Sequence, residues 1–258
     1  VNDRGGHISV VMAELQRIAS HLLCTGVFGL DLGAFTPFLW ALRDRERILD
    51  LFELTCGARL LYNYMWVGGL SHDIPNGFVE STYEFLDYFE PKVDELENIL
   101  AHNKILVERS ADIGVMPKDV AISYGVTGPN LRASGVNWDL RKNDPYSIYD
   151  RFEFNVPIGE GIKGTVGDCW DRFYVRILEI RESVKIIRQA LASMPKDGDV
   201  HQSLPKKLRP PKGSIYSRTE TPRGDLGYYI ESDGSPIPYR LKMRSPAFTA
   251  LSVIDEIG

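Results

Sequence analysis

Residues 9–64 read SVVMAELQRIASHLLCTGVFGLDLGAFTPFLWALRDRERILDLFELTCGARLLYNY, two helical patterns separated by the run GLDLGAFTP. Apolar residues recur at three- and four-residue steps in both patterns, which is the period of one face of an α-helix. Polar residues interrupt the apolar pattern at His21, at Asp31 and along the run from Arg43 to Arg47. Ionisable groups within an apolar element are costly unless they are paired or used, so we expect a site in this stretch.

The first helical pattern has a polar face as well as an apolar one. Glu14, Arg17 and His21 are spaced i, i+3 and i+7 and share that face, which is typical of a partly buried ion pair with a nearby histidine. Glycines at positions 26, 29 and 33 predict the end of the helix and place Asp31 in a glycine-rich connection. An aspartate in such a connection either caps a turn or acts as a functional acid, and the residues alone leave both possibilities open.

The second helical pattern has a clear start signal. Thr36 and Pro37 predict the N-cap and the first helical position. The charges from Arg43 to Arg47 alternate in sign. Such a run usually lies on a solvated helix face, and the alternative is a buried charge network.

The rest of the chain predicts a mainly helical α+β fold. A long helix is expected over 78–110, kinked or divided at Pro91, and the most regular helix over 168–194. Residues 110–157 are irregular but rich in aromatic residues, which favours an ordered loop. We expect one domain over 1–258, with a helical bundle over 8–195 and a small antiparallel sheet over 214–244.

Composition excludes several classes of protein. A net charge of −5 and a pI near 5.6 argue against nucleic-acid binding, and no apolar run is long enough to span a membrane. The three cysteines, at 24, 56 and 169, are too scattered for a disulfide framework. The chain starts VNDRGG without an initiator Met and ends IDEIG after an apolar run, so we expect a fragment.

Several segments taken together resemble one family. They read AELQRIASHLL, GLDLGAFTPFLWALRDRERILDLFE, TCGARLLYNY, DIGV, RASGVNWDLRKNDPYSIYDRFEFNVPIG, GDCWDRFYVRILEIRESVKIIRQAL and GDLGYYIESDGSPIPYRLKMRSPAF. In this order they resemble the D-type, or 49-kDa-type, subunit of respiratory complex I, the NADH:quinone oxidoreductase. This family is related to the large subunit of nickel–iron hydrogenases, and the resemblance covers nearly the whole chain.

The resemblance implies a quinone-binding core subunit without a cofactor of its own. Quinone, either menaquinone or ubiquinone, would be reduced between this chain and the B-type iron–sulfur subunit, which holds the terminal [4Fe–4S] cluster. Subunits C, I and H would be further partners, NAD would act at the level of the complex, and the chain would lie peripherally on the cytoplasmic side of the bacterial inner membrane. The family's quinone-facing histidine and tyrosine would precede Val1, and a further cavity-lining segment would follow Gly258.

The resemblance also assigns site residues near Asp31. Asp31 matches the family acid that pairs with the quinone-facing histidine, and a carboxylate in that position favours the protonated imidazole for proton delivery. Leu23, Val27 and Leu39 match positions that line the quinone tunnel. Two further residues adjoin it as support, namely His21 and Phe38.

A second group of residues matches positions near the terminal cluster. These are Arg59 and Leu61, and Leu61 stands where many family members carry a histidine. Leucine binds no proton, so this departure predicts a cluster potential that is lower and nearly independent of pH, which favours menaquinone. Two alternatives stay open: the large subunit of an energy-converting, membrane-bound nickel–iron hydrogenase, and a purely structural helical scaffold.

Overall fold

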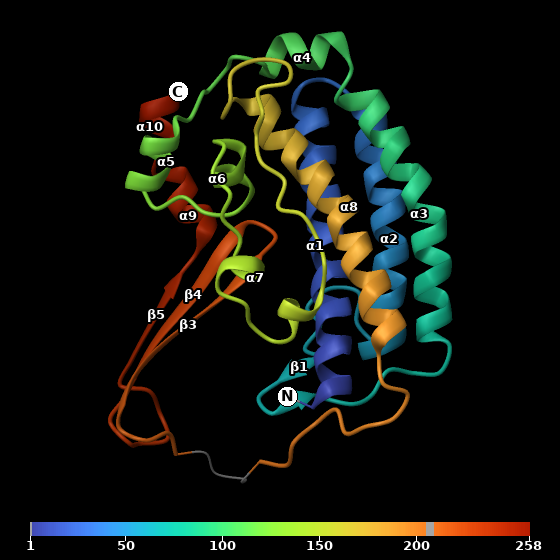
Figure 1. Cartoon of the computed structure of the whole chain (residues 1–258), viewed down its shortest axis with the longest axis vertical. Coiled ribbons are helices and arrows are strands. Elements are labelled where there is room, and N and C mark those ends of the chain that lie inside the picture. The colour runs from blue at the N-terminus through green and yellow to red at the C-terminus, as the bar shows by residue number, and fades with distance from the viewer. Residues whose placement is uncertain (1, 205–208) are drawn as a thin grey trace.

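Four long helices form the body of the computed structural model, which describes residues 2–204 and 209–258 (Figure 1). They are α1 (Asp3–Asp31), α2 (Phe35–Cys56), α3 (Phe78–Leu100) and α8 (Cys169–Ser193). Helix α1 packs against α2 and α8, and α3 packs against the same two helices, so the four helices close into a bundle. The apolar seam expected along α8 is confirmed, because Trp170, Ile177 and Ile187 on that helix are all buried.

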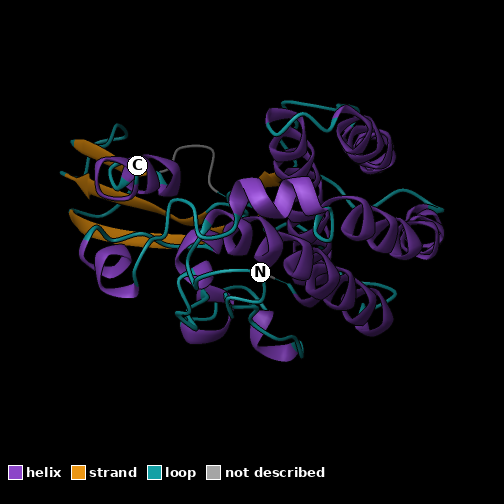
Figure 2. Ribbon diagram, turned by 90° about the horizontal axis from the view of Figure 1, so that it is seen from above, coloured by secondary structure: helices purple, strands orange, loops and turns teal. Residues whose placement is uncertain are grey.

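The sheet lies beside the bundle at the carboxy-terminal end of the chain (Figure 2). Its antiparallel strands, in the order β3–β4–β5, are β3 (Gly213–Thr221), β4 (Gly224–Ser232) and β5 (Arg240–Arg244). The register pairs Tyr216 with Tyr229, and Tyr229 with Lys242. The prediction of a mainly helical α+β fold with a small antiparallel sheet near the C-terminus is therefore confirmed.

Short elements lie between the long helices and after the sheet. In chain order these are β1 (Met65–Trp66), β2 (Gly69–Leu70), α4 (Lys104–Ser110), α5 (Lys118–Ser123), α6 (Pro129–Ala133), α7 (Leu140–Asn143), the 3-10 helix η1 (Tyr149–Arg151), α9 (Pro246–Leu251) and α10 (Ile254–Ile257). The segment 110–157, expected to be ordered but irregular, thus contains several single helical turns. Within the described residues, no helix is both long and apolar enough to cross a membrane.

The prediction that Gly26 and Gly29 end the first helix is wrong, because α1 continues through both to Asp31. A Cβ atom at Gly26 would come within 3.0 Å of the Ala41 Cβ on α2, and one at Gly29 within 2.9 Å of a Leu100 methyl group. Gly26 and Gly29 therefore allow neighbouring helices to approach α1 closely. Gly33 lies beyond the helix, and its φ of 93° favours glycine. In consequence, Asp31 is the last residue of α1 and not part of a loop.

Two other expected boundaries are also corrected. Helix α2 begins at Phe35, with Ala34 as its N-cap, so Pro37 lies within the first turn, where its missing N–H is not needed. Pro91 does not divide the third helix. The break in the helix expected over 78–110 comes after Leu100, because the Asn103 side chain accepts hydrogen bonds from two backbone amides and starts α4 there.

Candidate functional site

The polar face of α1 enters a buried charge network centred on Glu14. The Glu14 carboxylate accepts from the Arg17 guanidinium at 3.2 Å and from Arg141 Nη1 at 3.1 Å. It also accepts from the hydroxyls of Tyr149 and Ser183, each at 2.7 Å. The ion pair predicted from the spacing of Glu14 and Arg17 is thus confirmed, and it is completely buried.

A second buried carboxylate, Glu179 on α8, extends this network to the histidine. Glu179 Oε2 lies 2.8 Å from His21 Nε2, and Glu179 Oε1 accepts from Arg132 Nε at 2.7 Å. Arg132 Nη1 donates to Glu220 Oε1 on β3 at 3.0 Å. Asp139 pairs with the Arg141 guanidinium on α7 at 2.7 Å. The network therefore ties α1 to α6, α7, α8 and the sheet.

Burial and the neighbouring charges together decide which members of the network are ionised. Burial lowers the pKa of His21 to about 4, and the hydrogen bond to Glu179 offsets only part of this effect, so His21 is neutral at pH 7. Burial also opposes ionisation of Glu14 and Glu179, but the adjacent guanidiniums outweigh it and hold the pKa of both carboxyls below the usual range. Burial raises the pKa of Glu220.

The network holds no surplus of positive charge. Its charged members are Glu14, Arg17, Arg132, Asp139, Arg141, Glu179 and Glu220. Three guanidiniums therefore face four carboxylates, or three if Glu220 keeps its proton. Sequence reasoning found only the two members on α1 and the adjoining His21, because the other partners come from segments far along the chain.

Three of the residues assigned to the quinone site form a stripe near the C-terminal end of α1. Leu23, Val27 and Asp31 are four residues apart, so they lie on one face of the helix. Val27 is 36% exposed and Asp31 is also exposed. Leu39 is 49% exposed near the start of α2, and Phe38 beside it is half-buried. The structure therefore brings these five residues to the same end of the α1–α2 pair.

His21 does not belong to that surface. It lies two residues before Leu23, which places it about 200° around the helix. Its ring is buried against Glu179 on α8. His21 can therefore act on the stripe only through the packing of α1.

The residues expected near an iron–sulfur cluster lie at the opposite end of α2. Helix α2 has 22 residues, which corresponds to a length of about 33 Å. Beyond its C-terminus, Arg59 pairs with Glu46, Asp50 and Glu53 at 2.6–2.7 Å. The Leu61 side chain is 100% exposed and its φ is 56°, an unusual backbone conformation for leucine. The predicted residues therefore form two sets, one at each end of this helix.

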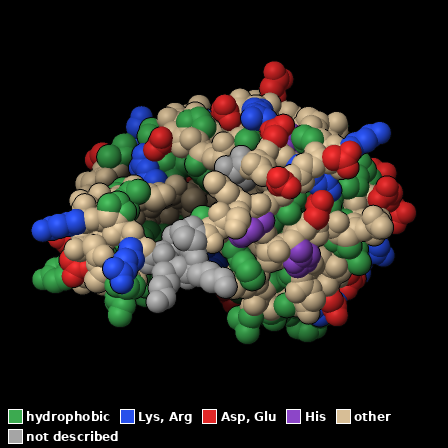
Figure 3. All heavy atoms as spheres, turned by 90° about the horizontal axis from the view of Figure 1, so that it is seen from below, with side chains coloured by type: hydrophobic (Ala, Val, Ile, Leu, Met, Phe, Trp, Pro, Cys, Tyr) green, Lys and Arg blue, Asp and Glu red, His purple; other side chains and the backbone are tan. Residues whose placement is uncertain are grey.

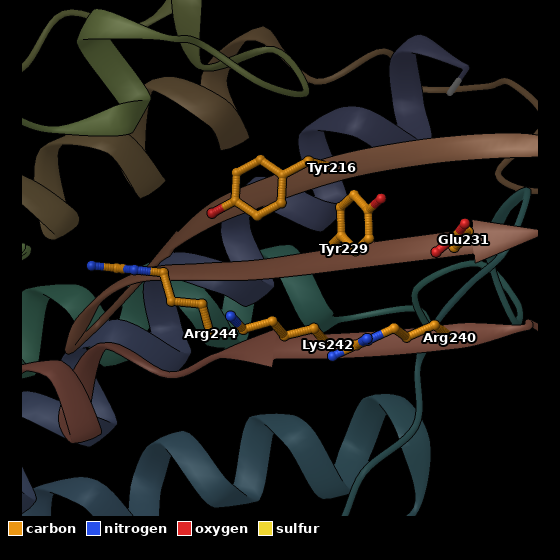
Figure 4. A pocket seen from close by; sticks show the side chains of 6 residues that line it. All are labelled: Tyr216, Tyr229, Glu231, Arg240, Lys242 and Arg244. Carbon is orange, nitrogen blue, oxygen red and sulfur yellow. The ribbon is translucent and has the colours of Figure 1, made fainter.

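The sheet has a polar face that sequence reasoning missed. A cavity of about 580 Å³ lies over it (Figure 4), lined by Tyr216, Tyr229, Glu231, Arg240, Lys242 and Arg244. The cross-strand register places these side chains on one face of the sheet. Seen from below, the surface is also hollowed between the sheet and the bundle (Figure 3). Within residues 2–204 and 209–258, no cluster of His, Cys, Asp or Glu side chains is arranged to hold a metal ion.

The helical bundle, the buried charge network and the late sheet occur in a chain whose sequence matches one known family. The family described as "Respiratory-chain NADH dehydrogenase, 49 Kd subunit" matches residues 31–210 and 201–258. The chain belongs to this family.

Three relatives illustrate the similarity. The D-type subunit of the NADH-quinone oxidoreductase of Chlorobium phaeovibrioides is 53% identical over 254 residues, which are 97% of this chain and 64% of that protein. Its counterpart in Chlorobaculum tepidum gives the same identity and coverage. A D-type subunit of Cytophaga hutchinsonii, numbered 1, is 50% identical over 259 residues, 98% of this chain and 66% of that protein. The chain thus spans slightly less than two thirds of the length of these relatives.

Proposed function

We propose that this chain is the quinone-binding core subunit of an NADH:quinone oxidoreductase. Its family membership and the relatives named as D-type subunits of NADH-quinone oxidoreductase support this function. One structural observation supports the location of the site: the exposed side chains of Val27 and Leu39 and the half-buried Leu23 lie at the same end of the α1–α2 pair as the exposed carboxylate of Asp31. A quinone has an apolar body and needs protons on reduction, and this surface offers an apolar wall with an acid at its edge.

In this proposal, Asp31 supplies protons indirectly. Its carboxylate pairs with a histidine from a part of the protein outside residues 1–258 and stabilises the protonated imidazole. That imidazole then holds a proton at neutral pH and delivers it to the reduced quinone. Phe38 supports the wall from α2, and His21 supports it from the buried side of α1.

The other end of α2 faces the electron donor in this proposal. Arg59 and Leu61 adjoin an iron–sulfur subunit that holds a [4Fe–4S] cluster, and subunits C, I and H complete the surroundings. Because α2 is about 33 Å long, the quinone cavity extends along the α1–α2 pair from the Asp31 end towards the cluster. NADH delivers its electrons elsewhere in the complex, and this chain lies peripherally on the cytoplasmic side of a bacterial inner membrane.

Replacing Asp31 in the assembled enzyme tests the proposed function. We expect Asp31→Asn to lower NADH:quinone turnover at least about tenfold, because general acid catalysis usually contributes that much or more. Electron transfer from NADH to ferricyanide should stay unchanged, since it does not need the quinone site. The matched control is Asp119→Asn, which removes an exposed carboxylate from α5. Equal quinone turnover in both variants would favour a purely structural scaffold instead.

A further inference from the structure

A cavity of about 370 Å³ lies beside the N-terminal half of α8. Its walls come from α6, α8, the β3–β4 turn, α9 and α10. A second cleft, of about 200 Å³, adjoins it, because Asn130, Arg172 and Arg176 line both. Apolar side chains, among them Met116 and Leu251, make up most of the wall of the larger cavity. This wall suits the apolar part of a small ligand.

Three arginines line the larger cavity, and among the described residues none of them has a carboxylate partner. Arg172 donates to a backbone carbonyl and, at 3.0 Å, to Cys169 Sγ. Arg176 donates to a carbonyl of its own helix and, at 2.8 Å, to Asn130 Oδ1. Arg223, in the β3–β4 turn, makes neither a hydrogen bond nor an ion pair with any residue that the structure describes. Three positive charges therefore stay uncompensated around one cavity.

This arrangement differs from the rest of α8. Further along the helix, Arg181 and Arg188 each pair with two carboxylates of α3. A ligand can reach the three cavity arginines, because Arg172 and Arg176 are half-buried and Arg223 is exposed. Guanidiniums in a cleft of one sign of charge attract anions, and the charged hydrogen bonds formed there are stronger than those to neutral acceptors. The cavity therefore favours a ligand with an anionic group.

We propose that this cavity binds an anionic group, a phosphate or a carboxylate, carried on a small apolar body. The anion lies among the three guanidiniums, whose planar forks match the terminal oxygens of either group. The apolar body lies against the side chains of α9 and α10. The site is separate from the proposed quinone site, since Leu23, Val27 and Asp31 line neither the cavity nor the adjoining cleft. Its binding does not depend on the proposed quinone reduction.

Cys169 reports on occupancy, because its half-buried free thiol lies in the adjoining cleft, 3.0 Å from Arg172 Nη2. In the full-length protein within its native assembly, the rate of Cys169 alkylation by iodoacetamide is measured by mass spectrometry. The probes are phenyl phosphate and benzoate. They are compared with benzyl alcohol, which is neutral, and with inorganic phosphate, which has no apolar body. Cys56 is the internal control, since it lines a different cavity.

We expect phenyl phosphate and benzoate to protect Cys169 at about one tenth of the concentration that benzyl alcohol needs, because one hydrogen bond between charged groups gives about that factor. Inorganic phosphate should protect less well than phenyl phosphate, and the rate at Cys56 should not change. Added sodium chloride should weaken protection by the two organic anions but not by the alcohol.

Equal protection by the anions and the alcohol would overturn the proposal, as would equal protection by inorganic phosphate and phenyl phosphate. So would protection that salt does not weaken, no protection by any probe, or a Cys169 that is closed to iodoacetamide throughout.

Two variants separate the ligand from the fold. Arg223→Gln removes an exposed cation from the cavity, so the phenyl phosphate concentration needed for protection should rise about threefold. The matched control is Arg240→Gln, which removes an exposed arginine of β5 outside the cavity and should change nothing. Ala250→Leu narrows the cavity from α9 without altering any charge, so it should abolish protection by phenyl phosphate. Unchanged protection in either cavity variant would show that the anion binds elsewhere and would contradict the proposal.

Discussion

The two halves of α1 distribute polar and apolar side chains in opposite ways. From Glu14 to His21 the helix buries ionisable groups, and their partners come from α7 and α8. From Val27 to Asp31 the same helix leaves an apolar side chain and a carboxylate at the surface. The first half therefore satisfies its charges within the chain, whereas the second half presents a surface that a ligand or another chain can complete.

This contrast shows which kind of polar residue indicates a site. A buried ionisable group with partners on all sides orders the fold, because removing any partner leaves a charge without compensation. An exposed apolar stripe beside a carboxylate contributes little to the fold and is free to bind. Three of the next four predictions test this division, and the one at Leu61 tests the assignment at the far end of α2; they run from the largest expected effect to the smallest.

The largest effect is expected in the buried charge network. Arg132→Met removes the common partner of Glu179 and Glu220, which stay buried, so the free energy of unfolding should fall by about 3–5 kcal/mol. Arg188→Met is the control, because its pairs with Asp87 and Glu90 are largely exposed and should contribute about 1 kcal/mol at most. Urea denaturation measures both values. Similar losses in the two variants would contradict a special role for the network.

His21 gives the next largest effect, through pH. Its pKa of about 4 in the folded chain lies below the ordinary value of 6.5, so the unfolded chain binds more protons and stability falls as the pH decreases. Between pH 6.5 and 4.5 we expect a loss of about 2 kcal/mol from this residue. Unfolding curves across this range measure it. His21→Gln should remove this part of the slope, whereas replacing the exposed His102 in the same way should leave it intact.

In the proposed arrangement, Leu61 adjoins the terminal cluster and should set how that cluster responds to pH in the assembled complex. With leucine, the midpoint potential of the terminal cluster should be nearly independent of pH between 6 and 9. Leu61→His adds a group that binds a proton when the cluster is reduced. The slope should therefore approach about 60 mV per pH unit between the pKa values of the imidazole with the cluster oxidised and with it reduced. Redox titration followed by electron paramagnetic resonance measures both slopes. A strong slope with Leu61 in place would contradict the assignment.

The smallest effect on stability is expected at the exposed stripe. Val27→Thr should change the free energy of unfolding by no more than about 0.5 kcal/mol, because the side chain is partly in solvent. The same substitution at the buried Val10 of α1 should cost about 1–3 kcal/mol. Only Val27→Thr should raise the KM for quinone without a large loss of stability. Equal destabilisation at both positions would remove the distinction between the two halves of α1.

Regular patterns in the sequence predicted much of the fold. The seam of α8 recurs every three or four residues from Trp170 to Leu191, and the strands are separated by clear turn residues. The pair of Glu14 and Arg17 was also predictable, because both residues lie on one helical face. These features depend on local spacing, which a sequence shows directly.

Features that depend on distant contacts were not predictable in the same way. Glu179 and Glu220 join the network from positions more than a hundred residues beyond α1. Gly26 was expected to end a helix and instead allows α2 to approach, because both roles need the absence of a side chain and look identical in the sequence. The stripe at Leu23 and Val27 was assigned by resemblance, since apolar residues on a helix usually indicate a core.

Photoaffinity labelling with an azidoquinone tests the proposed location of the quinone site most directly. Trypsin releases the stripe in one peptide, residues 18–43, and the Leu61 region in another, residues 60–92. In the assembled enzyme we expect the label in residues 18–43, at the face of Leu23, Val27 and Leu39, and we expect excess unlabelled quinone to abolish it. Labelling that is absent from residues 18–43, or that persists there under excess quinone, would contradict the account.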